Sequence, residues 1–428
     1  MDTTDLKDKL SEGFKAFQEC RWQDTITLLE ESYAADQSNA DVASKLGFAF
    51  SQNREFDRAI EVFKHLSSIQ SERAVWPYSV GYQLYIQSHW VQSIEWFDKA
   101  LNLNPDYVKA LYRKGYAQLQ SGKREEGLQT LQHCIKAWEQ SSREDQQTDR
   151  KYYAKANFAV GKAYLAVGLS LKARRPLERS VEFDSEDADK RYELGKCLLV
   201  NANADGAIEQ LTKANSLKPG LDYVLDRLAQ ALIAKGDLNR AEETYKMIPE
   251  DRRRPYILKN MGELYLDLKQ PNKAEGILRQ ALKRDRNSHN IHYLLGRALE
   301  ALERKGAARQ AYSKALELRE KNYGRDFPDA RARMEQLDSE LPDILVSPDY
   351  TAGDGNEYGS IEYYNTQKGY GFIVSDTGKK VFFHVTNIVG NILPTEGASV
   401  LFQYEDSPKG LKATKVNLLT AEQGADNV

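Results

Sequence analysis

The sequence predicts an α-helical solenoid of about nine repeats followed by a small all-β barrel. Three observations predict this fold class. Glycines recur 34 residues apart through most of the chain, and a stretch rich in acids, proline and glycine follows at residues 338–358. Beyond that stretch, apolar residues alternate with a period of two, which is typical of strands. A chain of 428 residues is long enough for both parts.

A glycine, or in one case an alanine, marks each repeat. The markers are Gly13, Gly47, Gly81, Gly115, Gly161, Gly195, Ala229, Gly262 and Gly296, spaced by 34 residues apart from one step of 33 and one insertion of 12. Twelve residues after most markers stands a small side chain, and sixteen after stands a large one. Small residues let two helix backbones approach closely, and we expect the large residue to fill the groove between that pair and the next.

In period and in its small and large positions, the array resembles the tetratricopeptide repeat family over residues 4–337. Prolines near the unit ends, Pro105 and Pro219, also match that family. The resemblance implies pairs of antiparallel helices, stacked over residues 1–337 into a right-handed superhelix whose first helices line a concave face. The polar stretch 139–151 is expected to lengthen a helix or loop between the fourth and fifth units.

The resemblance also predicts the lining of the concave face, because positions three before and one after each marker point inward in this family. These positions hold Tyr78, Tyr82, Tyr112, Tyr116, Phe158, Lys162, Tyr192, Lys196, Asp226, Gln230, Lys259, Glu263, Tyr293 and Arg297. Such a lining can stack bases, hold an extended peptide or grip an acidic partner; alternatively, some of the tyrosines pack inside the superhelix. No asparagine follows a marker, which argues against capture of a chaperone's C-terminal carboxylate.

The C-terminal region reads as a linker, a barrel and a tail. Residues 338–358 contain six acids and no Lys or Arg, a composition typical of a linker. The runs "SIEYYNT", "GFIVS", "KVFFHVT" and "ASVLFQYE" then alternate in hydrophobicity between turn residues. Five short strands are expected in residues 359–419, which favours a small closed barrel, and residues 420–428 form a tail.

Residues 359–419 resemble the cold-shock domain, a five-stranded OB-type barrel that binds single-stranded RNA or DNA. The family's tryptophan-phenylalanine-asparagine run is matched by Tyr363-Tyr364-Asn365, and its two ribonucleoprotein motifs by residues 368–373 and 381–384. The resemblance, together with base stacking on aromatic side chains and phosphate contacts from lysine, implies a nucleic-acid site. Its residues are Tyr363, Asn365, Lys368, Tyr370, Phe372, Phe382, His384, Lys409 and Lys412. Alternation puts Tyr370 with Phe372, and Phe382 with His384, on one face of adjacent strands.

Three residues depart from the family's pattern. Glu362 replaces a lysine, Tyr363 a tryptophan and Val385 a stacking phenylalanine. The barrel has six lysines and five acids, a net charge of +1, so we expect weaker binding than by a free-standing cold-shock protein. Residues 252–335 carry 20 Lys and Arg against 11 acids, and this excess is either a functional basic surface or ordinary solvation of helix exteriors.

Composition narrows the remaining possibilities. Lys and Arg total 60 against 63 acids, a formal net charge of −3, which excludes a polybasic binder as a whole. Cys20, Cys134 and Cys197 are odd in number and widely spaced, which indicates a reducing compartment. The N-terminal residues show no signal-peptide run and no stretch has membrane-span length, so we expect a soluble cytoplasmic protein.

No cofactor or metal is expected, and we predict that the protein is not an enzyme. His289 and His292 have a spacing that metal ligands use, but no third ligand accompanies them, and we expect ordinary surface histidines. Walker, GxSxG and HExxH motifs are absent from the sequence.

Two functions therefore compete. The first is an RNA-binding adapter, in which the barrel stacks bases while the array recruits a protein partner or extends the groove. The second is a protein-interaction scaffold, such as an accessory subunit of a cell-envelope or regulatory complex, whose barrel no longer binds nucleic acid.

Overall fold

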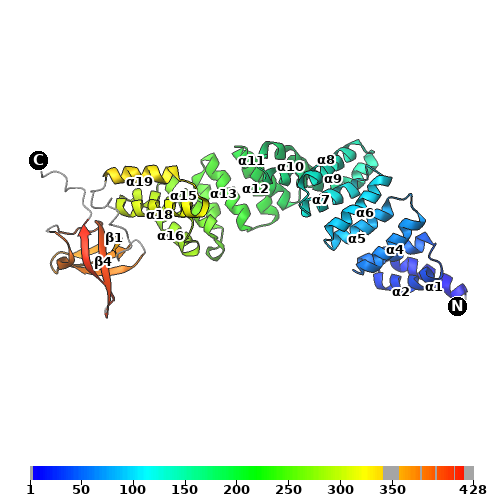
Figure 1. Ribbon diagram of the computed structural model, residues 1–428, viewed down its shortest axis with the longest axis horizontal. Coiled ribbons are helices and arrows are strands. Elements are labelled where there is room, and N and C mark those ends of the chain that lie inside the picture. The colour runs from blue at the N-terminus through cyan, green and yellow to red at the C-terminus, as the bar shows by residue number, and fades with distance from the viewer. Residues whose placement is uncertain (1–2, 341–355, 376–377, 391–392, 409, 419–428) are drawn as a thin grey trace. The chain divides into compact units, whose positions relative to one another are not determined.

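The structure, a computed structural model, describes residues 3–340, 356–375, 378–390, 393–408 and 410–418. The chain forms two compact units, Met1–Val224 and Leu225–Val428. The described part of the first unit is helical, whereas the second contains both helices and a closed barrel (Figure 1). No described helix is both long and apolar enough to cross a bilayer.

The first unit consists of six successive helix pairs, each made of two antiparallel helices joined by a short turn (Figure 1). The pairs are α1 (Thr3–Gln18) with α2 (Trp22–Ala35), α3 (Ala40–Gln52) with α4 (Phe56–Ile69), α5 (Val75–Ile86) with α6 (Trp90–Leu103), α7 (Val108–Gln120) with α8 (Arg124–Gln140), α9 (Arg143–Ala166) with α10 (Ser170–Phe183), and α11 (Ala188–Val200) with α12 (Ala204–Leu217). Within this unit, the second helix of each pair also contacts the first helix of the next pair.

The helices continue into the second unit through α13, which spans the boundary. They are α13 (Asp222–Lys235), α14 (Leu238–Lys246), the short 3₁₀ helix η1 (Glu250–Arg252), α15 (Pro255–Asp267), α16 (Pro271–Arg284), α17 (His289–Glu300), α18 (Lys305–Tyr323) and α19 (Pro328–Glu340). The predicted helical solenoid is thus confirmed, with the helices in the order that nine units of two require and α19 after them.

The marker glycines allow close contact within a helix pair. A Cβ added to Gly161 would lie 2.5 Å from the side chain of Leu177, and one added to Gly296 would lie 2.5 Å from Tyr312. Every glycine marker meets the large residue sixteen positions later in this way, and those large residues are buried. The large side chain therefore fills the space above the glycine of its own pair. It also reaches the next pair, as expected, where Phe63 stacks with Trp76 of α5.

The polar insertion lengthens α9, which has 24 residues. Its first turns pack back on α8: the rings of Trp138 and Tyr153 stack with centroids 4.0 Å apart, and the indole N–H of Trp138 donates to the carbonyl oxygen of Gln146 at 3.0 Å. Ser142 caps the helix by accepting the backbone N–H of Asp145. The insertion is therefore an ordered helical extension.

Five strands form the closed barrel: β1 (Asn356–Asn365), β2 (Tyr370–Ser375), β3 (Lys380–His384), β4 (Ser399–Ser407) and β5 (Gly410–Leu418). The strand order is β1-β2-β3-β5-β4, with β4 closing on β1 and a parallel contact between β3 and β5. Its core consists of Ile361, Tyr364, Ile373, Val381, Phe383, Val400, Phe402, Ala413 and Val416. The predicted five-stranded OB-type barrel is confirmed, and β1 begins three residues before the expected start at Gly359.

Candidate nucleic-acid interface

A β-bulge in β1 determines which aromatic residues face outward. Ile361 pairs with Ile373 and Tyr363 with Phe372, so Glu362 is an extra residue without a partner on β2. Strict alternation would place Tyr363 on the same inward side as Ile361. Because of the bulge, Tyr363 is instead 41% exposed, while the next residue, Tyr364, packs in the core.

The face of β2 and β3 carries the other predicted stacking residues. Tyr370 lies directly opposite His384, and Phe372 lies opposite Phe382. In both strands these residues are partly exposed and alternate with buried ones. The four side chains therefore occupy one outward surface of two adjacent strands, as alternation predicts.

Ring contacts join the aromatic side chains of β1, β2 and β3 into a continuous surface, and His384 lies opposite Tyr370 on the same face. The ring of Phe382 stacks on Tyr370 with centroids 5.9 Å apart, and meets Phe372 edge to face at 5.8 Å. The ring centroids of Tyr363 and Tyr370 lie 6.4 Å apart. We call the set Tyr363, Tyr370, Phe372, Phe382 and His384 the aromatic platform. Its rings offer π faces on which unpaired bases can stack.

Asn365 supports the platform and the turn that follows it. Its side-chain oxygen accepts the backbone N–H groups of Gln367 and Lys368 at 3.1 and 2.9 Å, and its amide donates to the hydroxyl of Tyr363 at 3.2 Å. These bonds occupy its polar atoms, so Asn365 acts here as a positioning residue. The turn also needs Gly369, whose φ of +67° lies in the left-handed region.

Close packing inside the barrel requires glycine at position 371. It faces the barrel interior, where an added Cβ would lie 2.2 Å from the carbonyl oxygen of Tyr363 and 2.6 Å from the ring of Phe383. A larger residue would therefore push β1 away at the bulge. Gly371 keeps Tyr363 close to the neighbouring strand.

The cations around the platform differ in their pairing. Lys368 and Lys412 are exposed, and no carboxylate of the described residues lies within ion-pair distance of either. Lys412 lies opposite Phe382 in the parallel contact between β3 and β5. Lys409 lies outside the described residues. Sequence reasoning missed Lys380, whose Nζ lies 5.0 Å from the ring centroid of Phe372, although its position two residues before Phe382 indicates the same face.

His384 is oriented by the residues that follow it. The backbone N–H of Thr386 donates to its Nδ1 at 3.4 Å, and its own backbone N–H donates to the side-chain oxygen of Asn387 at 3.1 Å. With Nδ1 acting as acceptor, the neutral ring carries its proton on Nε2. Val385 is in the short helix η3 (Val385–Asn387), and its backbone N–H donates to the carbonyl oxygen of Gly369. This bond stabilises the turn between β1 and β2.

In the first unit, several predicted concave residues line one cavity of about 570 Å³. Tyr112, Tyr116, Phe158 and Lys162 contribute to it, from α7 and α9. Arg124, Lys155 and Lys190 add positive charge, and Tyr85 adds a further aromatic ring that sequence reasoning missed. Lys190 is 3% exposed and pairs with Asp184 and Asp187, both at 2.6 Å. The surplus positive charge of the cavity therefore comes from Arg124, Lys155 and Lys162.

Tyr78 and Tyr82 lie beside Arg113, another residue that the sequence did not single out. The guanidinium of Arg113 lies 4.0 Å from the ring centroid of Tyr82, and its Nε donates to the hydroxyl of Tyr78 at 2.9 Å. Burial raises the pKa of Tyr78 well above its ordinary value, so this phenol stays neutral and accepts the bond. Tyr78 and the 9%-exposed Tyr112 thus support the interior packing alternative, whereas Tyr116 and Lys162 are more open.

The remaining concave positions have mixed surroundings. In the first unit, Tyr192 packs against Tyr223 with centroids 4.8 Å apart, and Lys196 pairs with Glu193. In the second unit, Lys259 lies 3.8 Å from Glu263. Asp226 is buried and accepts hydrogen bonds from Gln230, Tyr245 and Asn260.

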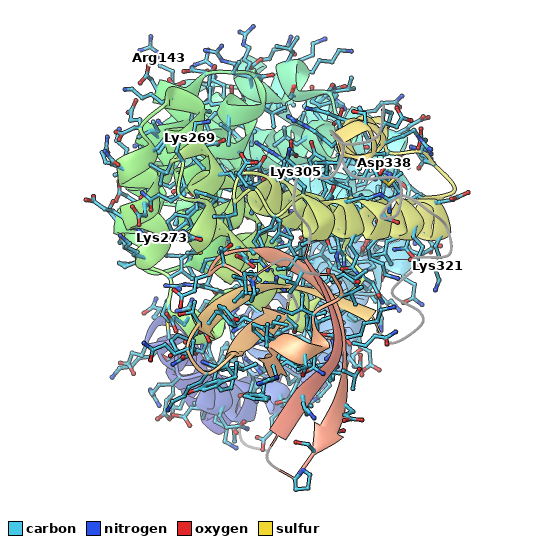
Figure 2. All side chains as sticks on the ribbon, turned by 90° about the vertical axis from the view of Figure 1, so that its left-hand side faces the viewer. Arg143, Lys269, Lys273, Lys305, Lys321 and Asp338 are labelled. Carbon is cyan, nitrogen blue, oxygen red and sulfur yellow. The ribbon has the colours of Figure 1, made fainter. Side chains whose placement is uncertain are left out.

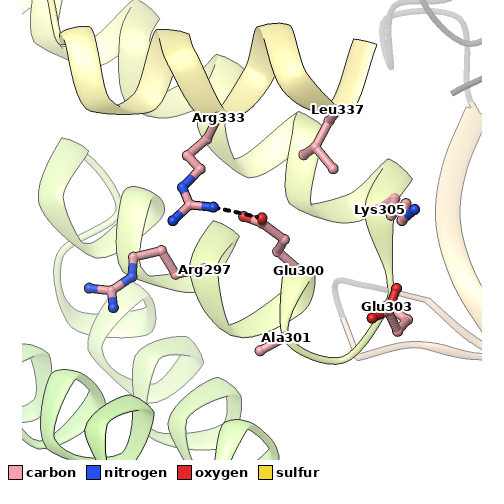
Figure 3. A pocket seen from close by; sticks show the side chains of 7 residues that line it. All are labelled: Arg297, Glu300, Ala301, Glu303, Lys305, Arg333 and Leu337. Carbon is pink, nitrogen blue, oxygen red and sulfur yellow. Dashed lines mark hydrogen bonds and ion pairs between the residues drawn. The ribbon is translucent and has the colours of Figure 1, made fainter. Parts of the chain in front are cut away.

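Two further predicted residues lie on α17. Tyr293 packs on Tyr312 and Phe327. Arg297 lines a cavity of about 370 Å³ together with Arg333, which pairs with Glu300 at 3.1 Å (Figure 3). No carboxylate of the described residues pairs with Arg297, so its charge is available within this cavity.

The basic excess of residues 252–335 is partly neutralised. Ion pairs join Arg279 and Arg304 to Glu275, and Arg309 to Asp338. Exposed cations nevertheless remain, such as Lys269 in the turn before α16 and Lys321 on α18, both labelled in Figure 2. The positive charge of residues 252–335 that no ion pair neutralises is therefore carried by fewer side chains than the count of Lys and Arg in the sequence indicates.

His289 is not the surface residue that the sequence predicted. It is 6% exposed, and its ring packs edge to face against Tyr323 and Phe327. Its Nε2 lies 2.9 Å from Nη1 of Arg319, which can only donate. The start of α17 packs against the end of α18, and this contact buries the side chain. The described residues contain no cluster of three or more His, Cys, Asp or Glu arranged to hold a metal.

Family models match both parts of the chain. The model described as "'Cold-shock' DNA-binding domain" matches residues 357–419, and models of the tetratricopeptide repeat match residues 109–141, 198–264 and 259–323. Both kinds of domain are typically non-catalytic. A nucleic-acid-binding type of barrel joined to helical repeats is thus the class of protein that the fold and the platform define.

Individual relatives match different shares of the chain. The major cold shock protein of Micrococcus luteus is 41% identical over 64 residues, which cover 14% of this chain and 96% of the relative. The protein O-mannosyl-transferase TMTC3 of Homo sapiens is 23% identical over 280 residues, or 61% of this chain, but the chain spans only 30% of that protein's length. The chain belongs to the cold-shock domain family through its barrel, and it contains tetratricopeptide repeats.

Solved structures include similar helical arrays. A tetratricopeptide repeat protein from Parabacteroides merdae is 15% identical, covers 62% of this chain and 98% of its own, and has a TM-score of 0.43.

Proposed function

We propose that this protein is a non-catalytic adapter that binds single-stranded RNA through its barrel and recruits a protein partner through its helical array. The aromatic platform carries this proposal, because five partly exposed or exposed side chains form one surface on three adjacent strands. Stacking on such rings contributes about 1–3 kcal/mol per base with little sequence preference. Lys368 and Lys412 are exposed, and we expect them to contact the phosphates.

The test of the barrel is a fluorescence titration of the full chain with short oligonucleotides at several salt concentrations. The Tyr370→Ala plus Phe372→Ala variant should weaken binding by at least about tenfold, because two stacking surfaces are lost. Val374→Ala is the matched control, since Val374 is on the outward face of β2 but outside the platform. Absence of salt-sensitive binding by the unaltered chain would refute nucleic-acid binding by the barrel.

RNA is proposed over DNA as the ligand of the adapter, and this choice needs its own measurement. The ribose 2′-hydroxyl is the group that lets a protein distinguish RNA from DNA at a given site. Titrations with ribose and deoxyribose oligonucleotides of identical sequence should give the tighter affinity for RNA. Equal or tighter binding of DNA would contradict this part of the proposal.

The partner of the array is proposed to be a protein segment that combines acidic and apolar side chains. The cavity of about 570 Å³ supports this choice, since Tyr116 and Phe158 provide apolar surface beside Lys155 and Lys162. Crosslinking in cells, followed by identification of both RNA and protein, should yield both from the unaltered chain. Tyr116→Ala plus Lys162→Glu should lose the crosslinked protein and keep the RNA, whereas the exposed residue Lys136 provides a control as Lys136→Glu.

A protein-interaction scaffold is the second candidate. The pair between Glu362 and Lys380 favours it, because this pair neutralises a cation beside the platform, and Val385 provides no third stacking ring. A stable protein partner that copurifies through the array, with an absorbance ratio showing no bound nucleic acid, would favour the scaffold over the adapter.

We further propose that the protein works in the cytoplasm. All three cysteines are free thiols: Cys20 is exposed, and Cys134 and Cys197 are buried. Free thiols, including an exposed one, are typical of reducing compartments.

A further inference from the structure

Two basic segments that are far apart in sequence meet on the second unit. The segment Arg252–Arg254 runs from the last residue of η1 to the residue before α15, and the segment Lys283–Arg286 spans the end of α16 and the two residues that follow it. Arg284 joins them: its Nη1 donates to the carbonyl oxygen of Arg253, and its Nη2 donates to that of Glu250 at 3.2 Å. We call this surface the basic edge; it comprises Arg252, Arg253, Arg254, Lys283, Arg284 and Arg286.

Half of the cations of the basic edge make no ion pair among the described residues. Arg284 is held by backbone carbonyls, and no carboxylate of the described residues pairs with Arg254, Lys283 or Arg286. Arg253 has one distant partner, Glu250 at 3.5 Å. Counting residues 250–254 and 283–286, six cations face three acids, a net charge of +3 on a small surface. A local excess of this kind attracts anions over about a Debye length.

The backbone of the basic edge is well anchored. The Nε of Arg253 donates to the carbonyl oxygen of Ile248 at 2.9 Å, and the Nε2–H of His292 donates to the carbonyl oxygen of Arg286 at 3.0 Å. Together with the bonds from Arg284, these contacts tie the segment between α14 and α15 to the end of α16, and the residues after α16 to α17. The exposed cations therefore project from a fixed frame, which lowers the entropy that binding must remove.

An exposed aromatic residue follows these arginines in the sequence. Tyr256, in the first turn of α15, is 43% exposed and lies two residues from Arg254. A tyrosine near arginines provides a stacking surface close to groups that bind phosphate. Proteins that bind single-stranded nucleic acids use this combination. An acidic protein segment needs the cations but gains less from such a ring.

We propose that the basic edge is a second contact for the single strand that the barrel binds, holding its phosphates through Arg254, Lys283 and Arg286 while Tyr256 stacks on a base. The proposal rests on the proposed function for the identity of the ligand. Arginine supports it, because five of the six cations are arginines, and the planar guanidinium matches phosphate oxygens better than an ammonium does. The barrel, with its net charge of +1, lacks such a cluster.

Two contacts on one chain strengthen each other. When one site is occupied, the other binds the same strand intramolecularly, which raises overall affinity by up to about 10²–10⁴-fold without any new contact. A weak barrel and a modest basic edge can therefore act together on a long strand. A short strand that reaches only one site gains nothing from the other.

The test compares strands of about 6 and about 25 nucleotides on the full chain, with the affinity measured across a salt series. In the variant Arg254→Glu, Lys283→Glu, Arg286→Glu, the slope of log affinity against log salt for the long strand should become shallower by about 2, since each lost phosphate contact removes about 0.7. Affinity for the short strand should stay unchanged. The altered side chains are exposed and make no ion pair among the described residues, so folding should be retained, as circular dichroism can verify.

The control changes charge equally elsewhere. Lys136→Glu, Lys172→Glu, Arg175→Glu alters three exposed cations of the first unit that have no ion pair among the described residues. An equal change of slope in this control would show a general charge effect and would overturn the proposal. Displacement of the long strand by polyglutamate as effectively as by RNA of equal charge would also overturn it, in favour of an acidic protein ligand.

The two proposals fail in different ways. If the short strand binds and the basic-edge variant leaves the long-strand slope unchanged, the basic edge is refuted and the barrel proposal stands. If the short strand does not bind but the long strand binds through the basic edge, the barrel proposal fails, and the basic edge stands as a nucleic-acid contact of its own and not as a second one. In the Tyr370→Ala plus Phe372→Ala background, residual long-strand binding should vanish on substitution of the basic edge; persistence of that binding would contradict the inference.

Discussion

The carboxylate of Glu362 lies 2.5 Å from the ammonium of Lys380, at the edge of the aromatic platform. Glu362 is the extra residue of the bulge in β1, and Lys380 begins β3 with its Nζ 5.0 Å from the ring centroid of Phe372. Both side chains are about half exposed, at 47% and 57%. Glu362 therefore forms an ion pair with Lys380, which is the one cation among the described residues that lies over a ring of the platform.

We expect Glu362→Gln to tighten nucleic-acid binding by about two- to fivefold, because an exposed ion pair of about 0.2–1 kcal/mol no longer competes for Lys380. Asp406→Asn is the control, since it removes the same charge from an exposed position on β4. A titration with a short oligonucleotide checks this. Equal tightening by both variants would show that net charge, and not Lys380, is responsible.

Phe382 and Phe383 are adjacent on β3 but face opposite sides of the barrel wall. Phe382→Ala should weaken nucleic-acid binding by about 1–3 kcal/mol, because its ring contacts both Tyr370 and Phe372, while the barrel stays folded. Phe383→Ala should destabilise the barrel by about 3–5 kcal/mol, because Phe383 is fully buried. Oligonucleotide titration and urea denaturation of each variant separate the two effects. Loss of stability in the first variant would contradict the assigned faces.

Gly262 and Gly276 lie in the pair of α15 and α16 but have opposite surroundings. A Cβ at Gly262 would lie 2.5 Å from fully buried Leu278, whereas nothing lies within 4 Å of a Cβ at Gly276. Gly262→Ala should therefore destabilise the array by about 1–3 kcal/mol through overpacking. Gly276→Ala should stabilise it by about 0.5–1 kcal/mol, because alanine favours the helix. Thermal unfolding followed by circular dichroism checks both signs, and a neutral Gly262→Ala would refute the close contact.

His289 should make the stability of the array depend on pH. Burial, with a smaller effect of Arg319, lowers the pKa of His289 below its ordinary value of about 6.5. Between the lowered pKa and about 6.5 the unfolded chain binds more protons, so the free energy of unfolding falls as pH decreases through this range. Thermal unfolding midpoints should consequently be lower at about pH 5.5 than at about pH 7.5.

The substitution His289→Gln should reduce that difference between the two midpoints. His292 has a pKa that burial also lowers, so part of the difference should remain. His133→Gln, at an exposed position on α8, provides the comparison. An unchanged pH dependence in His289→Gln would contradict the role of this buried ring.

Local patterns in the sequence were sufficient for much of the fold. The period of 34 determined the helix pairs, because Gly161 and its equivalents leave no room for a side chain beneath the large residue sixteen positions later. Alternation determined the faces of β2 and β3, so that Tyr370 and Phe382 could be placed outward before any contact was known. Both signals repeat along a single segment, and the sequence displays them directly.

Contacts between distant segments were decided only by the tertiary structure. The bulge at Glu362 depends on the register between two strands, and it alone exposes Tyr363 and brings Glu362 to Lys380. The burial of His289 depends on the end of α18, and the basic edge depends on Arg284 reaching across to the carbonyl of Arg253. A periodic pattern specifies which face a residue occupies, whereas a neighbour's identity depends on packing between segments, which no single segment encodes.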